Sequence, residues 1–238
     1  MVRFGNFFFK YRNVVFPLCF AVLVLGTRPI PGGSGLDRWR YALGFSVALS
    51  GQLIRALTIG LAYIIRGGRN RRVYAKDLVT EGIFAHSRNP LYVGNLLIVT
   101  GLGVLANSLY FYIVGIPLFM FMYAAIVRAE EAFLTRKFGE EYIRYCKAVN
   151  RFVPKLSGIT KTIGSMTFRW RRLIIKEYGT TYTWLACAVL LIMKNDYIRF
   201  NYHMDRNALQ QGSAALALVT CLYLLARYLK KSGRLVDA

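Results

Sequence analysis

The sequence has few of the residues that build disulfides, metal sites or acidic surfaces. It contains four cysteines and two histidines among 238 residues, and their spacing fits neither a disulfide framework nor a zinc site. Only 11 Asp and Glu stand against 32 Lys and Arg, which gives a net charge of +21. Glycine-rich nucleotide loops and Walker sequences are absent. We therefore exclude a disulfide scaffold and expect no metal site.

Apolar residues, by contrast, are abundant and lie in long runs. Hydrophobic residues make up 55% of the sequence, and its mean hydropathy is +0.37. A soluble nucleic-acid-binding protein can carry a large positive charge but not such runs, so we expect no nucleic acid as a partner. A bilayer-spanning helix needs about 20 apolar residues. The composition predicts an all-α integral membrane protein with about six transmembrane helices, near 13–29, 40–65, 91–107, 109–127, 181–198 and 208–227.

Basic residues are distributed unequally between the two sides of these spans. With the N-terminus inside, 25 Lys and Arg fall on that side, 6 fall on the other, and Arg55 lies within a span. Because cytoplasmic loops retain basic residues, both termini and the loops at 66–90 and 128–180 are predicted to be cytoplasmic. The first span has the basic start of a signal peptide, but no A-x-A cleavage site follows it. We therefore interpret it as an uncleaved anchor.

The second predicted span carries the polar residues Gln52 and Arg55 near its middle. Its small residues Ala42, Ser46 and Ser50 recur at four-residue spacing, which favours close helix packing. An arginine at this depth must face protein, water or a partner charge. Arg55 therefore either snorkels or caps a neighbouring carbonyl, or it contacts an anionic group of a substrate. The sequence leaves both alternatives open.

The acidic residues are informative because each stands in a strongly basic sequence. Four of the eleven lie within twelve consecutive positions after the fourth span, as the pairs Glu130-Glu131 and Glu140-Glu141. The first pair continues the membrane helix at its cytoplasmic boundary, where a carboxylate can hold a cation or accept hydrogen bonds from ribose-like hydroxyls. The alternative is pairing with basic residues of the same helix, which suits the second pair better.

The stretch LVTEGIFAHSRNPLYVG, residues 78–94, leads directly into the third span. Gly82 allows a tight turn, and Pro90 fits the first turn of a helix. Asn89 is then placed to cap that helix, with unpaired backbone N–H groups nearby for a polar ligand.

Two amphipathic segments flank a boundary near residues 155–162. Phe138, Tyr142, Tyr145 and Val149 recur at helical spacing, and this aromatic face either lies on the bilayer or closes a pocket. Residues 168–176 mix aromatic, aliphatic and basic side chains, which is typical of an interfacial helix on anionic lipid headgroups.

Residues 78–94, a two-helix hairpin and then EEAFLTRKFGEEYIRYCKAVNRFVP closely resemble the core of the isoprenylcysteine carboxyl methyltransferase family. The related phospholipid N-methyltransferases share the later part of this pattern. The resemblance implies a membrane enzyme that uses S-adenosyl-L-methionine, with a cytosolic cofactor pocket and a lipophilic or lipid substrate that enters from the bilayer. It divides the chain into N-terminal membrane helices (1–66), a methyltransferase-like core (67–156), and a basic linker with two C-terminal helices (157–238).

The resemblance also assigns residues by position. It implies cofactor contacts for Lys76, Asp77, Leu78, Val79, Phe84, Asn89, Pro90, Leu91, Tyr92 and Glu130. The substrate-orienting arginine of eukaryotic members would fall at Ile126, whereas this chain has Arg128, about 200° further around a helix. For a carboxylate acceptor, the orienting cation is Arg88, Arg128 or Arg55. An amine acceptor must lose a proton, and Glu131 would accept it directly or through water.

Two other functions remain compatible with the sequence. One is an NADPH-dependent membrane reductase of the sterol-reductase type, which is similar to this family in its C-terminal architecture. The other is a non-catalytic membrane scaffold whose basic loops bind anionic lipid or RNA. The last two spans carry no recognisable motif, and the sequence does not indicate an oligomeric state.

Overall fold

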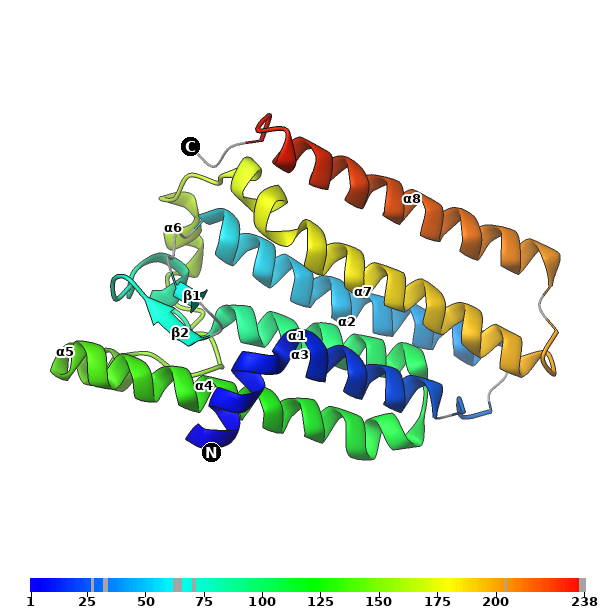
Figure 1. Ribbon diagram of the computed structural model, residues 1–238, viewed down its shortest axis with the longest axis horizontal. Helices are drawn as coiled ribbons and strands as arrows, with labels where there is room; N and C mark the ends of the chain where they lie inside the picture. The colour runs from blue at the N-terminus through cyan, green and yellow to red at the C-terminus, as the bar shows by residue number, and fades with distance from the viewer. Residues whose placement is uncertain (27, 32–33, 62–65, 70–71, 204, 236–238) are drawn as a thin grey trace.

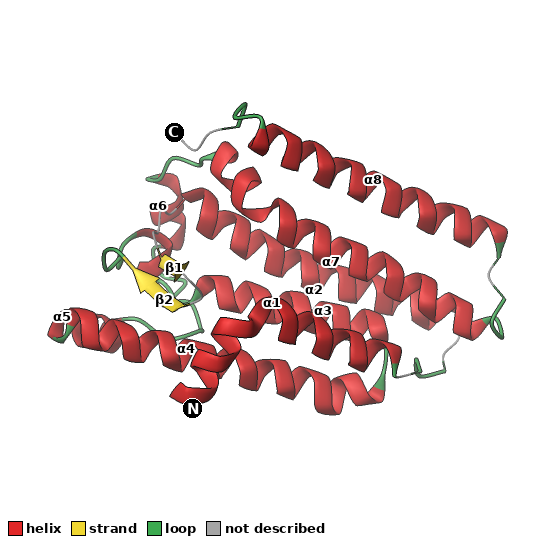
Figure 2. Cartoon of the chain, viewed as in Figure 1, coloured by secondary structure: helices red, strands yellow, loops and turns green. Residues whose placement is uncertain are grey.

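The computed structural model describes residues 1–26, 28–31, 34–61, 66–69, 72–203 and 205–235. Long helices lie side by side along one common direction, and shorter elements gather at one end (Figures 1 and 2). The long helices are α1 (Val2–Leu25), α2 (Ser34–Leu61), α3 (Pro90–Ala106), α4 (Ile116–Phe138), α7 (Trp170–Arg199) and α8 (Arg206–Lys231). A π-helical turn, η2 (Phe111–Gly115), precedes α4.

The shorter elements connect α2 to α3 and α4 to α7. Strands β1 (Arg66–Arg69) and β2 (Arg72–Ala75) form an antiparallel hairpin. The 3₁₀ helix η1 (Gly82–Ala85) follows, and Gly82 has a φ of 62°, as the predicted tight turn requires. Helices α5 (Glu140–Ala148) and α6 (Ile159–Gly164) complete this end of the molecule.

The fold is that of a helical membrane protein, as the composition predicts, with one short β-hairpin that the prediction did not include. Each of the six predicted spans falls on a helix, although residues 27 and 62–65 of the first two lie outside the described residues. Within the described chain, four stretches are long and apolar enough to cross a bilayer: 2–25, 38–61, 111–138 and 206–231. Helix α3 is apolar but has only 17 residues, and α7 carries charged residues in its first and last turns, which leaves only 178–193 without charge.

Helices α2 and α3 pack backbone against backbone. A Cβ on Gly51 would lie 2.5 Å from the carbonyl oxygen of Gly94, so neither position has room for a larger side chain. The small residues predicted to form such a contact are on the other face of α2 and are exposed: Ala42, Ser46 and Ser50. That prediction is wrong because α2 carries small residues on two faces, and the glycine-containing face allows the closer approach.

The segment predicted to be an interfacial helix, 168–176, is not a separate element. Helix α7 begins at Trp170 and continues without interruption to Arg199, so the aromatic and basic residues form its first turns. The backbone N–H of Arg169 donates to the carbonyl of Gly60 at 2.8 Å, which ties the start of α7 to the end of α2. Helix α8 packs along α7 on the outside of the bundle (Figure 1).

Candidate functional site

Two adjacent carboxylates are buried where α4 leaves the bundle. Glu130 is 3% exposed and Glu131 is 8% exposed, whereas Glu140 and Glu141 on α5 are exposed. The hydroxyl of Tyr92, in the first turn of α3, donates to Glu130 Oε1 at 2.6 Å. The first acidic pair is therefore part of the interior, and a hydrogen bond from the start of α3 orients one of its members.

Glu131 lies between two arginines. Arg151 donates to it through both Nε and Nη2, at 3.0 and 2.7 Å, and Nη2 of Arg88 lies 3.3 Å from Oε1. The hydrogen bond to Glu131 raises the pKa of the Arg151 guanidinium, so Arg151 stays charged over the whole working pH range. The three side chains carry one net positive charge, and both oxygens of Glu131 are occupied.

The segment 150–155 runs alongside residues 86–89 and fixes them. Main-chain carbonyls of this segment accept hydrogen bonds from the Arg88 N–H, the Asn89 side chain and the Ser87 hydroxyl, at 3.0, 3.1 and 3.2 Å. His86 Nδ1 lies 2.6 Å from the Lys155 carbonyl, which can only accept, so Nδ1 carries the proton. These contacts bring the two halves of the sequence motif together, although more than 60 residues separate them.

Helix α5 covers the loop that precedes η1. Its aromatic face is buried: Tyr142 and Tyr145 pack with Ala75 and Leu134. The Tyr145 hydroxyl donates to the main-chain carbonyl of Phe84 at 2.7 Å. This face is therefore buried within the chain and does not lie on the bilayer, while the alternative that it closes a pocket stays a prediction.

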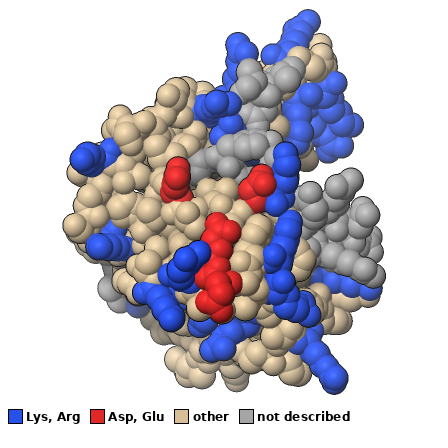
Figure 3. All heavy atoms as spheres, turned by 90° about the vertical axis from the view of Figure 1, so that its left-hand side faces the viewer, with Lys and Arg blue, Asp and Glu red and all other residues tan. Residues whose placement is uncertain are grey.

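The residues to which the resemblance assigns cofactor contacts differ in their burial. Phe84, Asn89 and Pro90 are buried, whereas Lys76 and Asp77 are exposed. Leu78, Val79, Leu91 and Tyr92 are half-buried. On the face at this end of the molecule, acidic side chains lie near the centre with Lys and Arg around them (Figure 3).

Asn89 and Pro90 occupy the predicted positions at the start of α3. Pro90 is the first helical residue and Asn89 is the N-cap residue, but the Asn89 side chain makes no capping bond. It donates instead to the carbonyl of Arg151, because the segment 150–155 competes for it. The prediction of a side-chain cap is therefore wrong, while the helix start itself is confirmed.

The candidate orienting arginines lie in three different environments. Arg128 is exposed on α4, whereas Ile126, where the eukaryotic family members have arginine, is 1% exposed. Arg88 lies against Glu131, and its Nε is buried with no hydrogen-bond partner in the described part of the chain. Of the three predicted catalytic residues, the structure brings Arg88 and Glu131 together and leaves Arg128 apart. Arg151, which sequence reasoning missed, completes the cluster.

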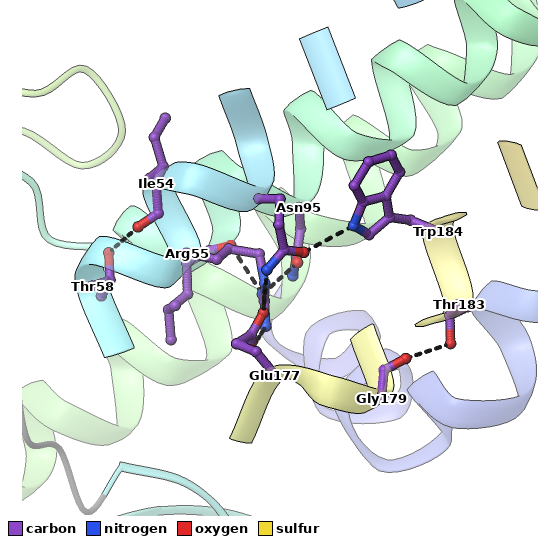
Figure 4. Close-up of polar contacts among 10 residues, drawn as sticks. Ile54, Arg55, Thr58, Asn95, Glu177, Gly179, Thr183 and Trp184 are labelled. Atoms are coloured by element: carbon purple, nitrogen blue, oxygen red, sulfur yellow. Dashed lines mark hydrogen bonds and ion pairs between the residues drawn. The ribbon is translucent and has the colours of Figure 1, made fainter. Parts of the chain in front are cut away.

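Arg55 is part of a second buried cluster, inside the bundle. Its Nε donates to Glu177 Oε2 on α7 at 2.9 Å, and its Nη1 donates to Asn95 Oδ1 on α3 at 2.6 Å. Figure 4 shows Glu177 and Asn95 converging on the Arg55 guanidinium. Gln52 links the cluster to Trp184, since it donates to Glu177 at 3.2 Å and accepts from the indole N–H at 2.9 Å. Arg55 therefore has a carboxylate partner within the chain.

Comparison with known proteins agrees with this geometry. A family model for phospholipid methyltransferases matches residues 39–141, which include α3, α4 and both carboxylates. Residues 39–141 are therefore similar to the phospholipid methyltransferase family over somewhat less than half of the chain. The resemblance seen in the sequence is thereby confirmed, and the family covers the helices that position the buried acids. No solved structure shows a significant match to the chain.

Curated relatives match about half of the chain. The cobalt-zinc-cadmium resistance protein CzcN of Cupriavidus metallidurans is 38% identical over 115 residues, and the nickel-cobalt-cadmium resistance protein NccN of Alcaligenes xylosoxydans xylosoxydans is 34% identical over 115. The protein-S-isoprenylcysteine O-methyltransferase of Schizosaccharomyces pombe is 34% identical over 124 residues. Each match covers 48% of this chain and 48% of the relative, so the match spans about half the length of each.

Proposed function

We propose that this chain is an integral-membrane methyltransferase that uses S-adenosyl-L-methionine and methylates a carboxylate or an amine of a lipophilic acceptor. The observation that carries the proposal is the pair of adjacent buried carboxylates at the end of the α3–α4 hairpin. Glu130 is held by Tyr92, and Glu131 is held by Arg88 and Arg151. Glutamate is rarely buried, so two adjacent buried glutamates in a chain of net charge +21 favour a binding role.

The side chains present suit this cofactor. Its ribose hydroxyls and ammonium need acceptors, and the Glu130 carboxylate is a buried acceptor beside the start of α3. Its carboxylate needs a donor, and Arg88 Nε is a buried donor without a partner among the described residues. Phe84 and the half-buried Leu78 offer apolar contact for an aromatic base. We therefore assign cofactor binding to these residues and to the segment between Lys76 and Tyr92.

When bound, the cofactor would supply a methyl group already activated by its sulfonium. The chain then has to align the acceptor and exclude water. Arg88 is fixed by Glu131 and is the best-placed cation to orient a carboxylate. Both Glu131 oxygens already contact guanidinium groups, which makes Glu131 a support for Arg88 and a poor acceptor for an amine proton. This arrangement favours a carboxylate acceptor over an amine.

A titration tests the cofactor directly. Protein purified in detergent would be titrated with S-adenosylmethionine, S-adenosylhomocysteine and NADPH, for the wild type, Glu130→Ala and the exposed control Glu140→Ala. We expect binding of the two methionine-derived ligands, a loss of at least about tenfold in Glu130→Ala, and an unchanged control. Binding of NADPH alone would support the reductase instead, and no binding of any ligand would favour the scaffold.

A further inference from the structure

Helix α1 packs on α4 beside the candidate site, at the end where the N-terminus lies (Figure 1). A Cβ on Gly5 would overlap the main-chain oxygen of Ala125, so the two backbones touch there. Further along α1, the Phe16 ring lies against the Tyr123 ring, with centroids 4.8 Å apart. Because a later residue of α1 meets an earlier residue of α4, the two helices are antiparallel.

Arg12 lies on the face of α1 that turns toward α4. Gly5 and Phe16 mark this face by their contacts, and Phe9, which is 3% exposed, lies between them. At about 3.6 residues per turn, Arg12 falls within about 60° of each of these three residues around the helix axis. Arginine on the packing face of a membrane helix is costly unless it meets a polar group or a ligand. Arg12 is nevertheless exposed, so a ligand can reach its charge.

Arg12 and the half-buried Tyr123 are close to one another and lack polar partners. The charges of Arg55 and Arg12 both act on the Tyr123 hydroxyl, but Arg55 is already paired with Glu177. Among the described residues, neither the Tyr123 hydroxyl nor the Arg12 guanidinium makes a hydrogen bond or an ion pair. The guanidinium lies instead over the Phe9 ring, 4.6 Å from its centroid. The Tyr123 oxygen keeps accessible surface, since the fully buried polar atoms without a partner in the described chain belong to other residues.

Tyr92 connects this pair to the candidate site. Its ring lies 5.8 Å from that of Tyr123, centroid to centroid, and its hydroxyl donates to Glu130 at 2.6 Å. Along α4, Tyr123 precedes Glu130 by seven residues, which is about 10 Å further into the apolar part of the helix. Arg12 and Tyr123 therefore lie on the bilayer side of the site, where a lipophilic acceptor would arrive.

We propose that Arg12 and Tyr123 bind the carboxylate of a lipophilic acceptor as it comes from the bilayer, and that they select acids over neutral lipids. This inference rests on the proposed function. The guanidinium supplies a charge and the hydroxyl supplies a second donor, which together suit the two oxygens of a carboxylate. The rings of Phe16 and Phe119 lie 5.8 Å apart beside them and offer apolar contact for the lipid tail. Arg88 remains the cation at the reacting position, and Arg12 and Tyr123 determine which acceptors reach it.

The binding of acids and of their esters tests the proposal. Oleic acid and farnesoic acid, each beside its methyl ester, would be titrated in detergent against the wild type, Arg12→Gln and Tyr123→Phe. The wild type should bind at least one acid about tenfold more tightly than its ester, because the ester has lost the charge. Arg12→Gln should reduce this preference to below about twofold, and Tyr123→Phe should reduce it by about threefold.

Lys10→Gln is the matched control. Lys10 is also exposed and is only two residues from Arg12, but it lies about 200° around the helix, with its Nζ over the Tyr11 ring at 5.1 Å. The control therefore removes the same charge at a similar depth on the side away from α4, and it should keep the full preference for the acid. An equal loss in Lys10→Gln would identify a general effect of charge and would overturn the proposal.

Titration of the same variants with S-adenosylmethionine separates this inference from the proposed function. We expect the cofactor affinity of Arg12→Gln to stay within about twofold of the wild type, because the altered group is distant from Glu130. If the cofactor binds but Arg12→Gln keeps the acid preference, or the wild type shows none, the inference fails and the proposed function stands. If no protein binds the cofactor but the acid preference depends on Arg12, the proposed function fails and the acid-binding site stands. Should Arg12→Gln not fold, an undiminished preference in Tyr123→Phe would overturn the inference.

Discussion

The two buried clusters of arginine and glutamate described above use their hydrogen-bonding groups differently. In the bundle, Arg55 and Glu177 are joined by Asn95 and Gln52, and the contacts tie α2, α3 and α7 together. At the end of α4, Glu131 holds two arginines, yet Arg88 Nε remains without a partner in the described chain. In the first cluster, residues of the chain itself supply the hydrogen-bond partners. The second cluster leaves the Arg88 Nε donor for a ligand.

The difference separates a structural role from a binding role. A buried ion pair with every group satisfied holds helices in register and offers little to a ligand. A buried cluster with an unused donor is at a free-energy disadvantage until a ligand supplies the acceptor. The comparison predicts that substitutions in the bundle cluster change stability, and that substitutions in the end cluster change ligand affinity.

The largest effect is expected for Glu177→Leu. This change leaves the Arg55 guanidinium buried without a carboxylate, which costs about 3–5 kcal/mol of folding free energy. Equilibrium unfolding in detergent micelles measures this loss of folding free energy. Lys176→Leu, an exposed neighbour on α7, is the matched control. Combining Glu177→Leu with Arg55→Met should recover much of the loss, and a double variant less stable than Glu177→Leu would contradict this interpretation.

A smaller, selective effect is expected for Arg88→Lys. Lysine keeps a positive charge near Glu131 but has no counterpart of the unpartnered Nε. S-adenosylmethionine should therefore bind about tenfold more weakly, as measured by calorimetry in detergent. Arg151→Lys is the control, because Arg151 Nε already donates to Glu131. The affinity of this variant for S-adenosylmethionine should fall less than about threefold. Equal losses in the two variants would remove the distinction between the arginines.

Tyr92→Phe should have a modest effect on the same affinity. The change removes the hydroxyl that donates to Glu130 and keeps the ring, so we expect a loss of about fivefold with little change in melting temperature. Tyr123→Phe serves as control, since its ring contacts that of Tyr92 with centroids 5.8 Å apart. A larger loss of affinity in Tyr123→Phe would point to that hydroxyl as the more important one.

The smallest effect is expected for Glu140→Ala. This side chain is exposed in the first turn of α5, where solvent screens its charge. Cofactor affinity should stay within about twofold of the wild type in the same calorimetric titration. A loss comparable to that of Glu130→Ala would mean that the two acidic pairs are not functionally distinct.

Local and compositional patterns predicted part of this structure. Hydropathy located the long helices, and Gly82 and Pro90 marked the turn and the start of α3, because those features depend on neighbouring residues alone. The scarcity of acids singled out Glu130 and Glu131 before their burial was known. The aromatic spacing of α5 identified the face that is buried, although it did not show what covers that face.

The sequence could not indicate which distant residues pair with one another in the fold. Glu177 lies 122 positions from Arg55, and nothing local distinguishes it from an exposed acid. Arg151 is one of several basic residues after α4, and only the path of the chain around α5 brings it to Glu131. The small residues of α2 offered two faces for packing, and the choice depended on glycines of α3.

The contact between residues 86–89 and 150–155 has a consequence for how this protein can vary. The acceptors described above, which segment 150–155 offers to residues 86–89, are main-chain carbonyls, which any amino acid at those positions would provide. Side chains at 150, 152 and 155 can therefore change without breaking the contact. An insertion or deletion of one residue between Asn150 and Lys155 would instead shift the acceptors past their donors. This part of the site is tolerant of substitution and intolerant of any change in length.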